Sequence, residues 1–235
     1  MKLGQEYHWH IVKTEEATPW VRHLYLETQG ERPPFIAGQY LTVKLPGVSP
    51  VEGKAYSISS APQEALVRIS IKRIGKFSEA LLALKTGDHL TTSAPYGFFY
   101  PEVDDTQSLV FIVGGIGITP CLSIIKDLLI RGDKRPLILH YSNQTKVDIA
   151  FYNELEILRQ QHTNLTVRYY LTRENLPDSG LKVGRMSIND VLCDIKSVDD
   201  TLCFICGAMD FTKTIWTRLN DEGVASHQLY TEGFF

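Results

Sequence analysis

The amino-acid sequence predicts two domains, an N-terminal antiparallel β-barrel and a C-terminal α/β domain built on a parallel sheet. Two observations carry this prediction. In the first part of the chain, short segments of alternating polarity are separated by glycine and proline, as in antiparallel barrels. In the second part, apolar strands alternate with helices, as in a parallel sheet with right-handed crossovers. The pattern changes in the polar segment PEVDDTQ, so we place the domains at residues 1–104 and 105–235.

The barrel strands are expected where β-branched and aromatic residues alternate with polar ones. These segments span residues 8–16, 23–28, 38–46, 54–62 and 66–74. One helix interrupts them, because Ser78 stands before EALLALK as an N-cap and Gly87 follows as a stop signal.

The strands of the α/β domain are expected at residues 108–115, 136–142, 165–173 and 201–207, and its helices at 121–132, 153–162, 187–195 and 212–223. The first strand runs into a glycine-rich turn, FIVGGIGITPCLSII, in which Gly114, Gly115 and Gly117 precede the Pro120 of the next helix. Glycines let the backbone approach a pyrophosphate, and a helix N-terminus adds positive potential. We therefore expect a phosphate group at this turn, although tight packing also explains glycines here.

The composition is that of an ordinary globular protein. Of the 235 residues, 43% are hydrophobic and 22% charged, and the formal net charge is −3. Nucleic acid is not expected as a main partner, because phosphate neutralisation requires a basic surface. No apolar run reaches the roughly 18 residues of a membrane span. We expect a soluble, cytoplasmic, monomeric protein.

The four cysteines do not indicate a metal site. Cys203 and Cys206 have CxxC spacing, but they lie in TLCFICG, which is typical of a strand entering a glycine turn. A zinc site requires a second pair, and a redox CxxC normally opens a helix. The CxxxxCxxC pattern of plant-type iron–sulfur clusters does not occur in the sequence. We interpret the cysteines as reduced thiols and expect no metal.

Several motifs occur in a fixed order along the chain. They are KAYSISSAP, then IGKFSEALLALKTGDHL, then GGIGITP and finally CGAMDF. In this order they resemble the ferredoxin–NADP reductase superfamily over nearly the whole chain. The resemblance implies an FAD-binding barrel, a Rossmann-like NAD(P)-binding domain, and electron transfer between NAD(P)H and a one-electron carrier through bound FAD. The carrier would be a small soluble protein such as ferredoxin, flavodoxin or a separate iron–sulfur protein.

The first motif implies three FAD-binding residues. By resemblance, Tyr56 lies against the isoalloxazine ring and the Ser57 hydroxyl approaches flavin N5. Lys54 stands where the family has an arginine that pairs with the FAD pyrophosphate. Lysine is a point charge without the planar donor fork of arginine, so we expect FAD to bind but to wash out more easily.

The second motif resembles the phosphate-binding Gly-x-x-Ser turn of the family. Backbone amides at the start of the helix, with the Ser78 hydroxyl, would hold the pyrophosphate. The FAD contacts implied for this region are Ile71, Arg73, Gly75, Lys76, Phe77 and Ser78. The neighbouring Lys72 also adds positive charge, which would serve phosphate binding, docking of an acidic carrier, or only a solvated strand edge.

In the second half the resemblance assigns a nicotinamide site. Cys206 of CGAMDF would lie by the nicotinamide, with Ala208 where the family usually has proline. The pocket would also include Gly115, Thr119 and Pro120. The chain ends YTEGFF, and relatives often place such residues over the flavin, which implicates Glu232 and Phe234 or Phe235; a frayed tail is the alternative. Ser57, Cys206 and Glu232 are thus the candidate catalytic residues.

We expect NADPH to be preferred over NADH. An NAD site usually offers a carboxylate after its second strand, but here SNQTK follows LILHY and the first carboxylate is Asp148. Arg173 and Arg185 resemble positions with which some bacterial members of the family grip the 2′-phosphate.

Three alternatives remain open. The chain could be an NAD(P)H:flavin reductase, for which flavin is a substrate; Lys54 favours this and the GKFS helix argues against it. It could be the reductase component of an oxygenase. It could also be a non-catalytic nucleotide-binding regulatory module.

Overall fold

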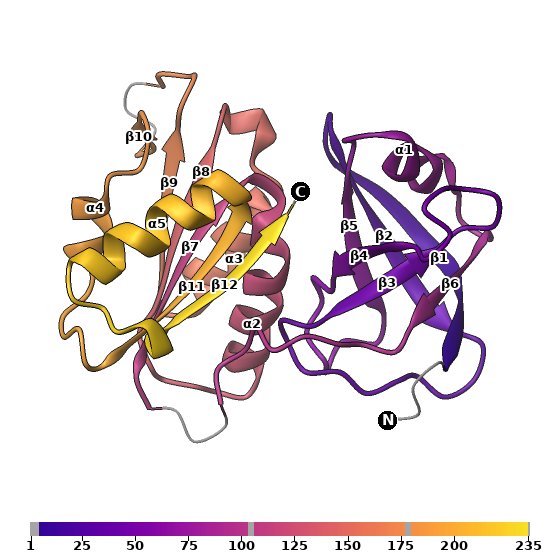
Figure 1. The fold of residues 1–235 in the computed structure, drawn as a ribbon, viewed down its shortest axis with the longest axis horizontal. Coiled ribbons are helices and arrows are strands. Elements are labelled where there is room, and N and C mark those ends of the chain that lie inside the picture. Colours follow the sequence, from indigo (N-terminus) through magenta and orange to yellow (C-terminus); the bar gives the residue numbers. More distant parts are fainter. Residues whose placement is uncertain (1–4, 103–105, 177–179, 235) are drawn as a thin grey trace.

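The protein folds into two lobes that lie side by side, each built on one sheet (Figure 1). The structure is a computed structural model, and it describes residues 5–102, 106–176 and 180–234. The predicted boundary between residues 104 and 105 lies outside the described residues.

The N-terminal lobe is an antiparallel six-stranded sheet in the order β4-β3-β6-β1-β2-β5. Its strands are β1 (Glu6–Thr18), β2 (Val21–Thr28), β3 (Tyr40–Lys44), β4 (Lys54–Ser57), β5 (Val67–Lys72) and β6 (His89–Ser93). The sheet closes into a barrel just after β4, where Ile58 bridges Ile69. The sequence indicated every strand except β6, whose short segment HLTTS shows little alternation.

The helix of this lobe begins earlier than predicted. α1 spans Lys76–Ala83 and its N-cap is Gly75, so Ser78 is the third helical residue and the predicted N-cap is wrong. The reason is the Ser78 hydroxyl, which accepts hydrogen bonds from the Ile74 and Gly75 amides at 2.9 and 3.0 Å and thereby closes the turn from inside the helix. The helix ends at Ala83 with Leu84 as its C-cap, before Gly87.

The C-terminal lobe is a parallel six-stranded sheet in the order β10-β9-β8-β7-β11-β12. Its strands are β7 (Ser108–Gly114), β8 (Leu137–Asn143), β9 (Leu165–Leu171), β10 (Lys182–Val183), β11 (Thr201–Ala208) and β12 (Leu229–Phe234). The order reverses between β7 and β11, and ligands of such sheets bind at the carboxyl ends of the strands at this point. The predicted class, an antiparallel barrel followed by a Rossmann-like sheet, is confirmed.

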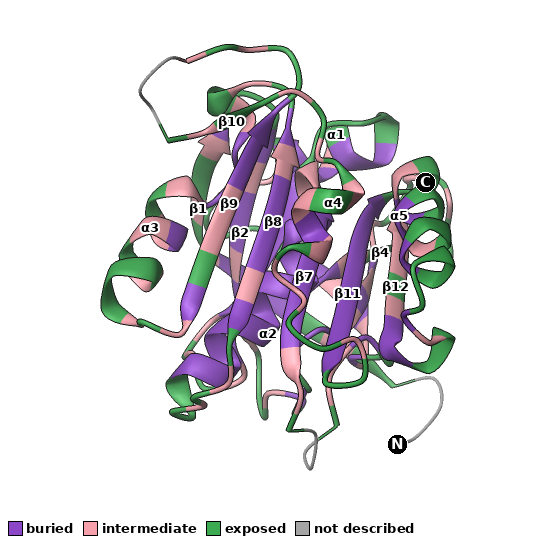
Figure 2. Cartoon of the chain, turned by 90° about the vertical axis from the view of Figure 1, so that its left-hand side faces the viewer, coloured by how far each residue is buried: buried purple, intermediate pink, exposed green. Residues whose placement is uncertain are grey.

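Helices cover both faces of the parallel sheet. Those of the lobe are α2 (Ile118–Ile130), α3 (Tyr152–Gln161), α4 (Ile188–Leu192) and α5 (Met209–Asp221). One apolar cluster packs α2 and α3 on the face toward the barrel, and another packs α4 and α5 on the opposite face. β11, and most of β7, are buried between these layers (Figure 2). In the ranges that the structure describes, no helix is long and apolar enough to cross a membrane.

Candidate functional site at the domain interface

The glycine turn after β7 lies at the point where the strand order reverses. A short 3₁₀ turn over Gly115–Gly117 leads from β7 into α2. A Cβ atom on Gly117 would lie 2.4 Å from the carbonyl oxygen of Cys206, so only glycine lets this turn pack against β11. Gly115 has φ +54 and lines an open cleft. The turn thus serves tight packing at Gly117 and leaves backbone free to face a ligand at Gly115.

A cleft of about 620 Å³ opens between the two domains. The barrel contributes Trp20, Lys72 and Arg73 to its wall, and the parallel sheet contributes the carboxyl ends of β7, β8 and β11. Lys72 reaches across the interface, because its Nζ lies 3.8 Å from the position that a Cβ of Gly115 would take. A phosphate in the cleft would therefore meet a cation from one domain and a glycine turn from the other.

Tyr56 presents an aromatic surface of the barrel. Its half-buried ring stacks on Phe77 of α1 with 6.4 Å between centroids and an interplanar angle of 21°. Burial raises the pKa of Tyr56 to about 12, so the phenol is neutral at physiological pH. Lys54, two residues earlier on the edge strand β4, is exposed.

Ser57 is buried next to this tyrosine, and its hydroxyl oxygen has no hydrogen-bond partner in the described part of the chain. Buried polar atoms without partners are rare, and they often mark a place for a ligand. Its cross-strand neighbour on β3 is Tyr40. These observations fit a bound flavin, with Tyr56 supplying a surface for a ring and Ser57 a free hydroxyl.

The start of α1 offers backbone donors for an anion. The amides in the first turn of a helix have no partner within the helix, and here they belong to Lys76, Phe77 and Ser78. The Ser78 hydroxyl donates to the Gly75 carbonyl at 2.7 Å, so it is engaged in the turn. Ile71 is fully buried in the barrel core, whereas Arg73 is exposed and lines the cleft.

The C-terminal segment forms a strand, at least as far as the structure describes it. β12 pairs in parallel with β11, and Glu232 lies opposite Cys206. The alternative of a frayed tail is therefore wrong for Glu232. Phe234 belongs to β12, although its side chain is not described, and Phe235 lies outside the described residues.

The carboxyl group of Glu232 is largely removed from solvent. Its Oε2 is buried, and none of the residues described around it gives that oxygen a hydrogen bond. Burial raises the pKa of Glu232 to about 7. Burial is the main reason that the pKa is raised for Tyr40 of the barrel and for Cys121 and Cys206 of the parallel-sheet domain, and the charge of Glu232 raises the pKa of each group further. Glu232 thus lies opposite Cys206 and close enough to Tyr40 and Cys121 to act on them electrostatically, and it can hold a proton near neutral pH.

The CxxC cysteines lie on opposite faces of β11. Cys206 packs in the apolar cluster beneath α2, and Cys203 packs in the cluster beneath α5. Both thiols are fully buried, and burial raises the pKa of each. Their side chains point away from each other, so they are reduced thiols of the core, as predicted.

Thr119 and Pro120 lie in the first turn of α2, and both are buried. The Thr119 hydroxyl donates to the Ile116 carbonyl at 3.0 Å.

The two candidate arginines lie at one edge of the parallel sheet. Leu171 of β9 pairs with Val183 of β10, and Arg173 and Arg185 each follow two residues later. Both arginines are exposed. The Arg173 amide donates to the carbonyl of Gln144 at 2.9 Å, and Gln144 lines the cleft.

Sequence reasoning missed Asn143 and Tyr40. Asn143 ends β8 in the cleft wall, and its buried Nδ2 donor finds no acceptor among the residues that the structure covers. The signal for Asn143 was its place at the carboxyl end of a strand next to the glycine turn. Tyr40 carried no such signal, because only the fold brings it near Glu232.

The comparisons with known proteins agree with this architecture. The family model for the oxidoreductase FAD-binding domain matches residues 9–100, and that for the oxidoreductase NAD-binding domain matches residues 111–216. The chain thus combines the two domains of an FAD- and NAD-binding oxidoreductase. It has an FAD-binding barrel followed by an NAD(P)-binding sheet, and this is the fold of ferredoxin–NADP⁺ reductases.

Solved structures show the same fold. The FAD/NAD-binding domain of nitric oxide dioxygenase from Vibrio cholerae superposes with a TM-score of 0.87 and 23% identity, covering 97% of this chain and 98% of that one. A ferredoxin–NADP⁺ reductase from Neisseria gonorrhoeae, with bound FAD and NADP, superposes with a TM-score of 0.85 and 23% identity, covering 99% and 100%.

The curated relatives are longer than this chain. The flavohemoprotein of Bacillus cereus is 28% identical over 239 residues, which cover 95% of this chain and 60% of the relative. The phenol hydroxylase P5 protein of Acinetobacter pittii is 32% identical over 181 residues, which cover 74% and 49%. The chain therefore spans only part of each relative.

Proposed function

We propose that the protein uses NAD(P)H to reduce a bound FAD and passes the electrons to a separate one-electron acceptor. The observation that carries this proposal is the interdomain cleft, which lies at the switch point of the parallel sheet and brings Lys72 of the barrel to Gly115. The cleft thus offers groups from both domains that can bind the phosphates of a dinucleotide. The two matching family models, for an FAD-binding and an NAD-binding domain, agree with this proposal.

The barrel would hold FAD through groups that folding leaves available. Tyr56 would lie against the isoalloxazine ring, and the unpaired Ser57 hydroxyl would face its reacting edge. The amides of Lys76 and Phe77 would hold the pyrophosphate, together with the charge of Lys54. Bound FAD supplies the chemistry of accepting a hydride and releasing electrons singly.

The parallel-sheet domain would hold the dinucleotide along the cleft. The Gly115 turn would face its pyrophosphate, and Asn143 would donate its free Nδ2 hydrogen. Arg173 and Arg185 would bind a 2′-phosphate, which makes NADPH the preferred donor.

Glu232 would control protonation and water at the reacting centre. Its carboxyl is protonated below about pH 7, so it can donate a hydrogen bond there without adding negative charge. Cys206 would form the floor of the site, as a small polarizable side chain beside Glu232. Thr119 and Pro120 would shape the same pocket from α2.

The acceptor is proposed to be a small soluble carrier such as ferredoxin or flavodoxin. The relatives also suggest other acceptors, since one is named a flavohemoprotein and another is a phenol hydroxylase protein. A haem or oxygenase centre on a separate polypeptide is the corresponding alternative.

Anaerobic reduction of the purified protein tests the proposal. We expect a yellow protein whose flavin absorbance is bleached by NADPH and restored by ferricyanide or by an added one-electron carrier. Bound FAD that neither NADPH nor NADH bleaches would contradict it and would leave the non-catalytic module. A colourless protein that retains no FAD would also contradict it, and would leave either that module or a flavin reductase.

A second candidate, an NAD(P)H:flavin reductase, is favoured by Lys54. The family has arginine there, whereas this lysine is exposed on an edge strand. The two candidates differ in flavin stoichiometry. A flavin reductase would lose FAD on gel filtration and oxidise NADPH in proportion to added free flavin.

A further inference from the structure

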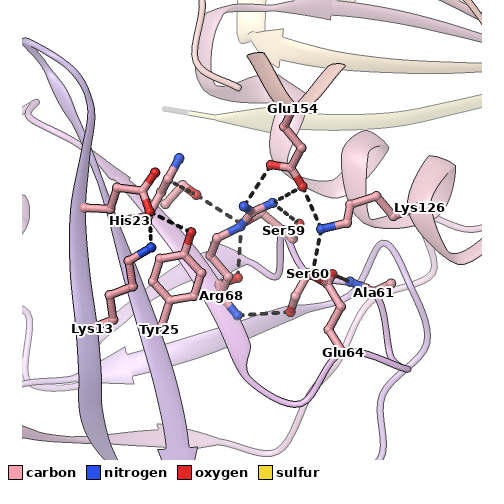
Figure 3. Close-up of polar contacts among 12 residues, drawn as sticks. Lys13, His23, Tyr25, Ser59, Ser60, Ala61, Glu64, Arg68, Lys126 and Glu154 are labelled. Atoms are coloured by element: carbon pink, nitrogen blue, oxygen red, sulfur yellow. Dashed lines mark hydrogen bonds and ion pairs between the residues drawn. The ribbon is translucent and has the colours of Figure 1, made fainter. Parts of the chain in front are cut away.

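A partly buried network of charged groups joins the two domains (Figure 3). Its centre is Arg68 on β5, whose side chain is 7% exposed. The guanidinium donates to both carboxylate oxygens of Glu154 on α3, at 2.8 and 3.2 Å. On its other side it donates to the hydroxyl and carbonyl oxygens of Ser59, at 3.1 and 2.9 Å. Arg68 is thus held by its own domain while it binds the other.

Lys126 extends the network. It lies on α2 with a side chain 10% exposed, and its ammonium contacts Glu154 at 2.6 Å and Glu64 of the barrel domain at 2.8 Å. Two cations and two carboxylates therefore alternate across the interface. The attraction of Arg68 and Lys126 holds the pKa of Glu154 below its ordinary value despite burial. The two positive and two negative charges balance, which offsets the cost of taking Arg68 and Lys126 out of water.

An aromatic side chain is inserted beside this network. Phe151, the N-cap residue of α3, has φ +66, a left-handed conformation that a bulky residue adopts only when its surroundings enforce it. Its ring stacks on His23 of β2, with centroids 4.4 Å apart and an angle of 16°. The Arg68 guanidinium lies 4.7 Å from the centroid of the same ring. A residue of the parallel-sheet domain is thus packed against two residues of the barrel.

In each domain, the network and its neighbours lie only a few residues along the chain from a proposed residue of the reacting centre. Ser59 and Ser60 follow directly after Ser57 and Ile58. Ser60 accepts a hydrogen bond through its carbonyl from the Ser123 hydroxyl at 2.6 Å, and Ser123 lies one helical turn after Thr119. The same contacts thus fix the strand that carries Ser57 and the helix that carries Thr119.

We propose that the Arg68, Glu154, Lys126 and Glu64 network is a positioning device that sets the distance between the nicotinamide and the flavin. Among the described residues that line the cleft, none belongs to this network. It acts on the alignment of the two rings through the angle between the domains. Hydride transfer requires near contact of the reacting atoms, and misplacement by about 1 Å can cost roughly a hundredfold in rate. This inference rests on the proposed function, since it assumes that NAD(P)H reduces the bound FAD.

The test compares Glu154→Gln and Lys126→Met with Glu156→Gln. Glu156 lies on the same helix, but its ion pair with Arg159 stays within one domain. We expect the two network variants to slow flavin reduction at saturating NADPH by about tenfold or more. The absorbance of the nicotinamide–flavin charge-transfer complex should weaken in parallel, while the KM for NADPH changes little. Lys126→Arg, which keeps the charge, should restore much of the rate.

FAD content and thermal midpoint are measured on every variant, so that loss of folding is recognised. If Lys126→Met and Glu154→Gln hold FAD and reduce it as fast as Glu156→Gln does, the positioning role is wrong. A slowed rate with an unchanged charge-transfer band also contradicts it, because the rings would then be aligned. A wild-type protein whose FAD is not reduced by NAD(P)H contradicts the proposed function itself.

Discussion

At the level of single residues, three buried polar atoms of the candidate site have no hydrogen-bond partner within the described ranges. They are the Ser57 hydroxyl oxygen, the Asn143 amide nitrogen and one oxygen of Glu232. A buried group without a partner costs about 1–3 kcal/mol. Three such atoms around one interface are best explained by ligands that supply the missing partners.

Ser57→Ala should keep FAD but slow its reduction. The substitution removes a hydroxyl that faces the reacting edge of the flavin, while the ring surface of Tyr56 remains. Stopped-flow reduction at saturating NADPH measures the rate, and the flavin-to-protein ratio is the control. A variant with full FAD and an unchanged rate would exclude this role for Ser57.

Glu232→Gln should change how stability depends on pH. The pKa of Glu232 is raised from 4.5 to about 7, so between these values the folded protein binds a proton that the unfolded chain has released. The free energy of unfolding contributed by this group therefore falls as pH rises from about 4.5 through 7. We expect the wild type to show this decrease in the free energy of unfolding with rising pH, and Glu232→Gln not to show it.

Chemical denaturation at a series of pH values measures the difference. Because both proteins share every other titrating group, the difference curve isolates Glu232. A flat difference between pH 5 and 8 would show that the carboxyl is not buried as the structure places it. The rate of flavin reduction should likewise lose its dependence on pH near 7 in the variant.

At the scale of elements, regular segments with strong periodicity could be predicted from sequence. The apolar strand before Gly114 and the helix after it carried their own signals. β6 and β12 did not, because a short strand is defined by its neighbours; the tail around Glu232 becomes a strand only by pairing with β11. The start of α1 was misplaced because the Ser78 hydroxyl can cap from inside the first turn as well as before it.

The edge strand β4 provides the next prediction. If Lys54 holds the FAD pyrophosphate, Lys54→Ala should lower FAD retention and Lys54→Arg should keep or raise it, because guanidinium binds phosphate through a planar fork. The flavin-to-protein ratio after gel filtration is the measurement. Equal retention in wild type and both variants would place Lys54 in solvent only.

The loops after β9 and β10 provide a prediction on the nucleotide. They bring Arg173 and Arg185 to one edge of the sheet, where they would bind a 2′-phosphate. Arg173→Ala and Arg185→Ala should each lower kcat/KM for NADPH about tenfold and leave that for NADH nearly unchanged. Arg159→Ala, whose ion pair lies on α3, is the control. If both variants keep the wild-type ratio of NADPH to NADH, neither arginine reads the phosphate.

At the scale of the whole molecule, the domains are tied together by buried contacts. The sequence predicted two domains and their cofactors, but it gave no sign of Arg68 and Glu154 as partners. Arg68 lies in a predicted strand and Glu154 in a predicted helix, and in each segment a single charged residue is consistent with an exposed position. Only the packing of β5 against α3 makes them a partly buried ion pair.

Because of this coupling, FAD should stabilise both domains although its proposed contacts are mainly in the barrel. Trp9 is buried in the barrel core, and Trp216 of α5 packs against the apolar cluster of the parallel-sheet domain, so each reports on one domain. Two single-tryptophan variants separate these signals. The double variant Trp20→Phe/Trp216→Phe keeps only Trp9, and Trp20→Phe/Trp9→Phe keeps only Trp216. A ligand at a hundred times its Kd adds about 2.7 kcal/mol to the native state. In thermal unfolding followed by fluorescence, added FAD should raise the midpoint reported by Trp9 and that reported by Trp216 by the same amount. A shift seen by Trp9 alone would show that the domains unfold independently and that the interface does not couple them.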